Sequence, residues 1–109
     1  MMEEEILHLY QEPAIGASYT NTYGEENIRN LLDKYSSLDN EGMQKMMDMV
    51  INFSQSTDLA TSFVSVGVLH ALGQSEGVAE AYSWADKQED AERIISHFEI
   101  GKSVADYFS

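Results

Sequence analysis

The feature of this sequence that most constrains its fold is a long segment without charge. From Leu59 through Ser75 the chain contains no Asp, Glu, Lys or Arg, whereas the whole chain has 19 acidic and six basic residues. A segment that avoids charge in so acidic a chain is best explained by burial. We therefore expect this segment to form the centre of the core, with the other elements packed around it.

The periodicity of this segment favours a helix. Four residues recur there at helical spacing: Leu59, Phe63, Val66 and His70. A strand over residues 63–69 is the competing interpretation, because valines alternate there and β-branched residues suit strands. The apolar run is longer than an ordinary strand, so we prefer the helix. Because Ser, Thr, Gly and His interrupt the run, we do not expect it to span a membrane, which takes about 20 apolar residues.

The rest of the chain predicts further helices joined by short links. Apolar periodicity and turn residues place them over residues 2–11, 22–35, about 40–54, 76–85, and from residue 91 to a break at Gly101. The predicted fold class is therefore all-α: a single small domain over residues 1–109, with five to six helices packed around a central apolar helix.

Local signals place several helix boundaries. Thr22 and Glu25 fit a capping box, in which Thr22 caps the helix and Glu25 reaches back. Asp39 and Ser75 are good N-cap residues for the helices that follow them. Gly73 fits the left-handed position that ends the central helix.

Four methionines crowd one predicted helix: Met43, Met46, Met47 and Met49. Flexible thioethers fill irregular cores, and they also line adaptable binding grooves. Helical spacing favours the core. The groove interpretation stays open and gives an alternative function, a helical adaptor that binds its partner through an apolar Met-rich surface.

The formal charge of −13 limits the choice of partner. Phosphates attract Lys and Arg, so direct binding to nucleic acid is not expected, and neither is binding to an anionic membrane surface. Charge complementarity favours a basic protein. The alternative is that the acids only maintain solubility. The acidic start Met-Met-Glu-Glu-Glu is unlike a secretory signal, so we expect a cytoplasmic protein.

No catalytic or metal-binding pattern is present in the sequence. His8, His70 and His97 lie far apart, there is no cysteine, and the glycines are too scattered to form a phosphate loop. We therefore predict a protein that is not an enzyme, without catalytic residues, metal or cofactor.

One short segment resembles the prosthetic-group site of acyl carrier proteins. The sequence Ser37-Leu38-Asp39 precedes a Met-rich helix, and that family is also small, acidic and helical, with its serine at a helix start. The resemblance implies phosphopantetheine attachment at Ser37. Ser36 stands where the family has Asp, so this is a minor alternative.

A second resemblance is carried by composition. A small, acidic, cysteine-free chain without a catalytic cluster resembles bacterial toxin-immunity proteins of the contact-dependent inhibition type. The resemblance implies an inhibitor that binds a basic partner, with a nuclease toxin domain as the leading case.

The hypothesis of an inhibitor selects two kinds of partner-binding residue. Acidic side chains would cover the basic substrate site of the partner, and we select Glu25, Glu26, Asp33, Glu89, Asp90 and Glu92. Aromatic side chains would supply the desolvated anchor, and we select Tyr19, Tyr23 and Trp84. The alternative for each is a solvated acidic face or a ring that covers the core.

Overall fold

The uncharged segment forms helix α4 (Leu59–Ala71) in the computed structural model, which describes residues 2–108. Six α-helices and one short 3₁₀ helix make up the described part of the chain, without a strand. The elements besides α4 are α1 (Met2–Gln11), η1 (Tyr19–Asn21), α2 (Glu25–Ser37), α3 (Asn40–Phe53), α5 (Ser75–Asp86) and α6 (Ala91–Ala105). The all-α prediction and the preference for a helix over residues 63–69 are confirmed.

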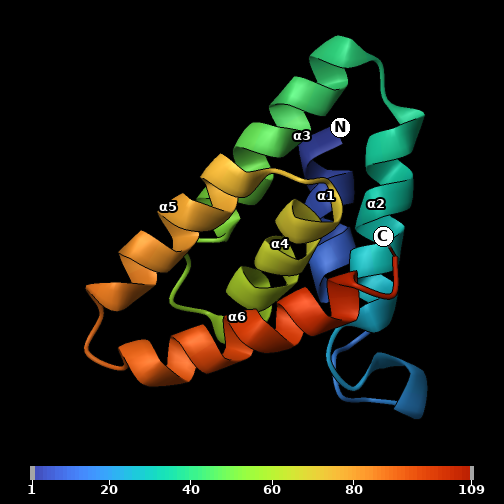
Figure 1. Cartoon of the computed structure of the whole chain (residues 1–109). Coiled ribbons are helices and arrows are strands. Elements are labelled where there is room, and N and C mark those ends of the chain that lie inside the picture. The colour runs from blue at the N-terminus through green and yellow to red at the C-terminus, as the bar shows by residue number, and fades with distance from the viewer. Residues whose placement is uncertain (1, 109) are drawn as a thin grey trace.

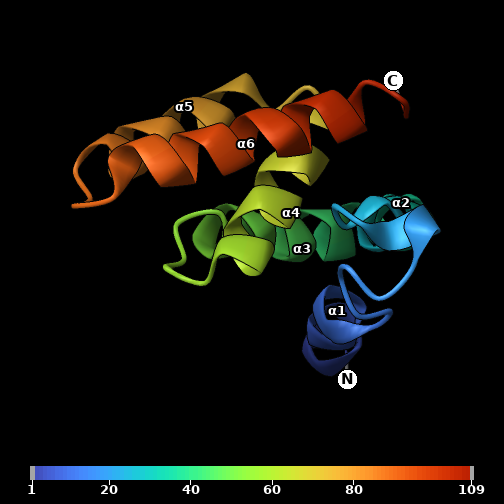
Figure 2. The same cartoon turned by 90° about the horizontal axis from the view of Figure 1, so that it is seen from below.

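Helix α4 lies at the centre of the fold (Figure 1). All residues from 62 to 69 are buried, as expected for a helix that is surrounded on most sides. Seen from below, α5 and α6 form one level, α4 lies beneath them with α2 and α3, and α1 forms the last level (Figure 2). The expectation of a central apolar helix is confirmed.

Both ends of α4 are capped by local hydrogen bonds. The carboxylate of Asp58 accepts from the backbone N–H of Thr61 at 3.1 Å and from its hydroxyl at 2.6 Å. At the other end Gly73 has a φ of 68°, and the N–H of Gln74 donates to the carbonyl of Leu69 at 2.9 Å. This is the left-handed termination expected at Gly73.

Two glycines bring α4 and α6 into backbone contact. A Cβ at Gly101 would overlap the carbonyl oxygen of Phe63, and one at Gly67 would lie 3.0 Å from the carbonyl oxygen of Gly101. The prediction that Gly101 breaks the last helix is wrong, because α6 continues through it to Ala105. Glycine is needed here for close approach of two backbones and not for a turn.

The start of α2 differs from the predicted capping box. The helix begins at Glu25 after Gly24, whose φ is 76°, and the Thr22 hydroxyl donates to the carbonyl of Ser18 at 3.3 Å. Glu25 does reach back, but its Oε1 accepts from the N–H of Tyr23 at 2.9 Å. The capping box is therefore wrong in its N-cap residue.

The other two predicted N-caps have different outcomes. Asp39 caps α3 as expected, since its carboxylate accepts from the N–H of Gly42 at 2.8 Å. Ser75 is already the first residue of α5, and the N-cap is Gln74, which makes no side-chain cap hydrogen bond. Ser75 as a cap is wrong by one position.

The methionines of α3 fill the core. Met46 is fully buried, Met47 is 6% exposed, and Met49 is partly buried and packs against the same cluster. Much of this face is therefore taken up by core packing, and the adaptor alternative, which needs it as a docking surface, stays a prediction. Thioethers here have the gap-filling role that flexible side chains suit.

His70 is a half-buried residue near the end of α4. Its Nε2 is buried and makes no hydrogen bond within residues 2–108. Burial lowers the pKa of the imidazole, the Lys102 charge lowers it further, and the charges of Glu99 and Asp106 raise it. The net pKa lies below the ordinary value of 6.5.

This pKa predicts a loss of stability in mild acid. As the pH falls below about 6.5, the unfolded chain takes up the His70 proton before the folded chain does. The free energy of unfolding then decreases, with a limiting slope of about 1.4 kcal/mol per pH unit for one proton. We expect His70→Gln to flatten the decline between about pH 7 and about pH 5 in urea titrations. His8→Gln, at an exposed position of α1, is the control for the loss of a histidine. If the free energy of unfolding of His70→Gln declined with pH as steeply as that of the parent, the result would contradict this account.

Candidate functional site

Exposed aromatic side chains gather at one end of the molecule. Tyr19 is fully exposed, Tyr23 is 49% exposed, and beyond α6 Tyr107 is 87% and Phe108 36% exposed. Both views place η1, the start of α2 and the end of α6 on one side (Figures 1 and 2). We call Tyr19, Tyr23, Tyr107 and Phe108 the aromatic end. Such a concentration of exposed apolar area is typical of a contact surface.

A groove of about 680 Å³ lies between the start of α2 and the end of α6. Apolar side chains form most of its walls and two carboxylates join them. Its lining residues are Tyr23, Glu25, Glu99, Ile100, Ser103, Val104, Tyr107 and Phe108. We call it the α2–α6 groove. It has the size and the mostly apolar lining of a site for one side chain or a small ligand.

Two buried asparagines position the loop that precedes this groove. Asn21 and Asn27 are both fully buried, and the Asn21 amide donates to the Asn27 Oδ1 at 2.8 Å. Asn27 in turn donates to the carbonyls of Leu9 at 2.9 Å and Pro13 at 3.0 Å. These hydrogen bonds tie the end of α1 and the loop to α2. The position of Tyr19, on η1, is therefore fixed by a polar network beneath it.

Sequence reasoning missed both asparagines. Asn21 lies between two predicted helices, and Asn27 lies within the second of them, next to Ile28. An asparagine inside a helical pattern is a weak helix former and therefore a signal of a specific hydrogen-bonding role.

The predicted acidic residues form two separate groups. Glu25 and Glu26 lie in the first turn of α2, beside the aromatic end, and Asp33 lies about two turns further along this helix. Glu89, Asp90 and Glu92 lie at the α5–α6 connection, on the opposite side (Figure 1). Helix α6 separates the groups, and its 15 residues span about 22 Å. The six acids selected from the sequence therefore do not lie together on one surface. We call the two groups the α2 acids and the α5–α6 acids.

The three predicted aromatic anchors also separate. Tyr19 and Tyr23 belong to the aromatic end, whereas Trp84 lies on α5 and packs half-buried against the core. Trp84 therefore covers the core, which was the alternative for this residue. Tyr107 and Phe108, which follow α6, also belong to this end and were not among the candidates.

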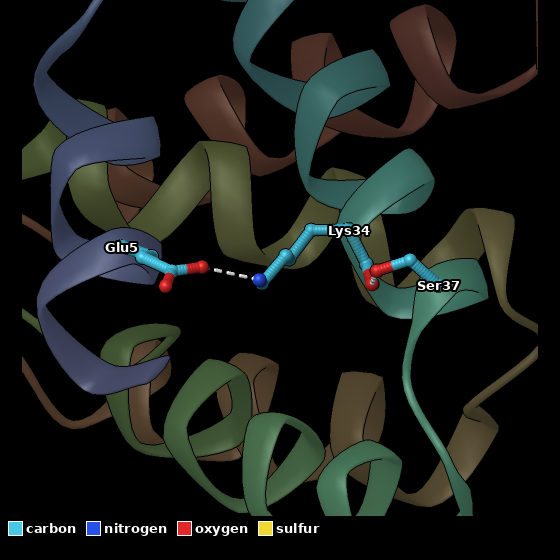
Figure 3. Close-up of polar contacts among 3 residues, drawn as sticks. All are labelled: Glu5, Lys34 and Ser37. Carbon is cyan, nitrogen blue, oxygen red and sulfur yellow. Dashed lines mark hydrogen bonds and ion pairs between the residues drawn. The ribbon is translucent and has the colours of Figure 1, made fainter. Parts of the chain in front are cut away.

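Few of the acids are neutralised within the fold. The ion pairs found in residues 2–108 join Lys34 to Glu5 and, at 3.6 Å, Lys45 to Glu41. Figure 3 shows Lys34 reaching from α2 to Glu5 on α1. The hydrogen bond and the charge of Lys34 lower the pKa of Glu5. These two ion pairs involve only two of the 19 acidic residues, so they leave most of the negative charge of the chain in place.

The position of Ser37 argues against an acyl-carrier site. Ser37 is the last residue of α2, and its hydroxyl donates to the carbonyl of Lys34 at 2.6 Å (Figure 3). The resemblance requires a serine at the start of a helix. The phosphopantetheine alternative therefore loses the local structure on which it depended.

Comparisons with models of protein families, with curated proteins and with solved structures found no match. None of the helices in residues 2–108 has both the length and the hydropathy needed to cross a bilayer. In the same part of the chain, no three His, Asp or Glu side chains come together as metal ligands would.

Proposed function

We propose that this protein is a non-enzymatic inhibitor that binds and neutralises a basic protein in the cytoplasm, as an immunity protein does with a nuclease toxin. The support is the formal charge of −13 together with the small number of acids that are paired inside the fold. Charge of this sign speeds encounter with a basic surface and disfavours nucleic acid.

The observation that carries this proposal is the position of the aromatic end beside the α2 acids. Aromatic side chains supply the desolvated centre of many interfaces, and charged residues form the rim. The fully exposed ring of Tyr19 and the half-exposed ring of Tyr23 lie next to Glu25 and Glu26 in the chain. The same arrangement is absent at the α5–α6 acids, where the neighbouring aromatic residue, Trp84, packs against the core.

Neutralisation then follows from occupancy of the partner's substrate site. A protein that binds a polyanion presents Lys and Arg where the phosphates lie. Carboxylates of the α2 acids would occupy these positions, and the aromatic rings would exclude water from the contact. Most of the acids would speed the encounter with the basic partner by electrostatic attraction, whereas the few residues at the aromatic end would supply most of the affinity.

Capture from a lysate of the source cells tests this proposal with two matched variants. One reverses two α2 acids (Glu26→Lys with Asp33→Lys), and the other reverses two α5–α6 acids (Glu89→Lys with Glu92→Lys). Both variants lose the same charge, and each includes one acid from the first turn of a helix. We expect the parent and the α5–α6 variant to retain one basic protein that salt releases, and the α2 variant to lose it.

Titrating the captured protein then tests neutralisation. If it is a nuclease, its activity should fall to zero at one equivalent of the parent chain. Identical capture by all three chains, or a partner that is acidic or resists salt, would contradict the proposed function.

A further inference from the structure

The α2–α6 groove combines features that rarely occur together on an acidic surface. Three aromatic rings line it, those of Tyr23, Tyr107 and Phe108, and two of these are among the most exposed apolar side chains of the described chain. The carboxylates of Glu25 and Glu99 lie in the same lining. An apolar groove with negative charge and aromatic faces favours a cation with apolar flanks.

The Glu25 carboxylate lacks half of its expected hydrogen bonding. Its Oε1 accepts from the N–H of Tyr23 at 2.9 Å, but its Oε2 is buried and has no partner within residues 2–108. A buried carboxylate oxygen without a donor is costly, and a charged donor that reaches it recovers that cost. Tyr23, Tyr107 and Phe108 line the same groove, and Tyr107 is 87% exposed. Exposed side chains change rotamer readily, and such a change would let a donor approach the Glu25 carboxylate.

The second carboxylate is held in place. Glu99 Oε2 accepts from the Tyr82 hydroxyl at 2.9 Å. Lys102 follows on the same helix but does not line the groove, and its charge acts on His70 of α4. The residues that line the groove therefore include two carboxylates and no basic side chain.

We infer that this groove is a binding subsite for an arginine side chain of the basic partner, with the Glu25 carboxylate as the acceptor. A guanidinium offers five N–H donors, is weakly hydrated and stacks on aromatic faces, whereas an ammonium is a strongly hydrated point charge. Ile100 and Val104 supply apolar walls for the three methylenes of arginine. The inference rests on the proposed function, because the basic partner presents the arginine.

The test uses no partner, so its failure is distinct from failure of the proposed function. The full-length chain, labelled with ¹⁵N, is titrated with the acetylated and amidated derivatives of arginine, citrulline and lysine. Citrulline has the shape of arginine without its charge. We expect saturable shifts of the Glu25, Ile100 and Ser103 amides with arginine, with a dissociation constant on the order of 1 mM. Citrulline and lysine should bind at least about fivefold more weakly.

Two substitutions locate the site. Glu25→Gln keeps the Oε1 acceptor and should weaken arginine binding about tenfold, because a charge-assisted hydrogen bond is lost. Glu80→Gln removes the same charge from an exposed position of α5, outside the groove, and should change binding by less than about twofold. Ser103→Lys, at an exposed position of the lining, should abolish it. The inference would be overturned if arginine bound no more tightly than citrulline or lysine. It would also be overturned if Glu25→Gln kept the parent affinity for arginine, or if the shifts did not saturate and were spread over the acidic surface.

Discussion

Gly101→Ala should destabilise the fold by about 2–4 kcal/mol, although alanine is the better helix former by about 1 kcal/mol. The added methyl would overlap the carbonyl oxygen of Phe63, and a backbone atom in the middle of α4 cannot move aside alone. The two helices would have to separate where their backbones are in contact. Urea unfolding followed by Trp84 fluorescence measures the loss, and the melting temperature should fall by roughly 10 °C or more.

Two other helical glycines provide a graded control. At Gly67 the nearest atom to a new Cβ is the flexible Cδ1 of Ile28, at 2.7 Å, followed by the carbonyl oxygen of Gly101 at 3.0 Å. At Gly77 the nearest atoms are side-chain carbons at 3.3 and 3.4 Å. We therefore expect an intermediate loss for Gly67→Ala and a change within about 1 kcal/mol for Gly77→Ala. Equal stability of Gly101→Ala and Gly77→Ala would contradict the backbone contact between α4 and α6.

The second large effect is expected at Asn27. Asn27→Ala removes one buried hydrogen bond that Asn27 accepts and two partly buried ones that it donates, and it leaves the carbonyl of Leu9 without this donor. We expect a loss of about 2–4 kcal/mol. The loop should loosen as well, so the Gly16 amide, which donates to the carbonyl of Asn21 at 2.8 Å, should lose its protection from hydrogen exchange.

Asn30 gives the matched control for this substitution. It lies on the same helix, is only partly buried, and makes no side-chain hydrogen bond within residues 2–108. Asn30→Ala should leave stability within about 0.5 kcal/mol and the loop unchanged. If Asn27→Ala were equally harmless, the buried network would not be what fixes Tyr19 at the aromatic end.

Local sequence signals predicted where the helices lie, but they did not predict which helices contact one another. The first helix was placed over residues 2–11, as observed, because Pro13 and the apolar spacing define it from nearby residues alone. Gly101 was read as a break because glycine often ends helices. Its actual role depends on Phe63 and Gly67, which lie on another helix and cannot be linked to it by periodicity.

The candidate site also combines residues that the sequence identified with residues that only the fold brings together. Tyr23 and Glu25 were selected from the sequence, and both line the groove. Glu99 and Tyr107 were missed, because only the fold brings the end of α6 to the start of α2. The acids of α2 and of the α5–α6 connection were selected as one set, although α6 separates them, because charge in a sequence carries no information on which side of the molecule it lies.

The most direct test of the proposed inhibitor is the rate at which it associates with its captured basic partner. Stopped-flow mixing of the purified proteins, from about 50 mM to about 500 mM salt, gives that rate for the parent and the two double variants. We predict a parent rate above about 10⁷ M⁻¹ s⁻¹ that falls steeply with salt. Reversal of Glu26 and Asp33 should lower it at least about tenfold and flatten the salt dependence, and reversal of Glu89 and Glu92 should change it by less than about threefold. Equal rates for the two variants, or a parent rate that ignores salt, would contradict an inhibitor that acts through the acidic surface beside the aromatic end.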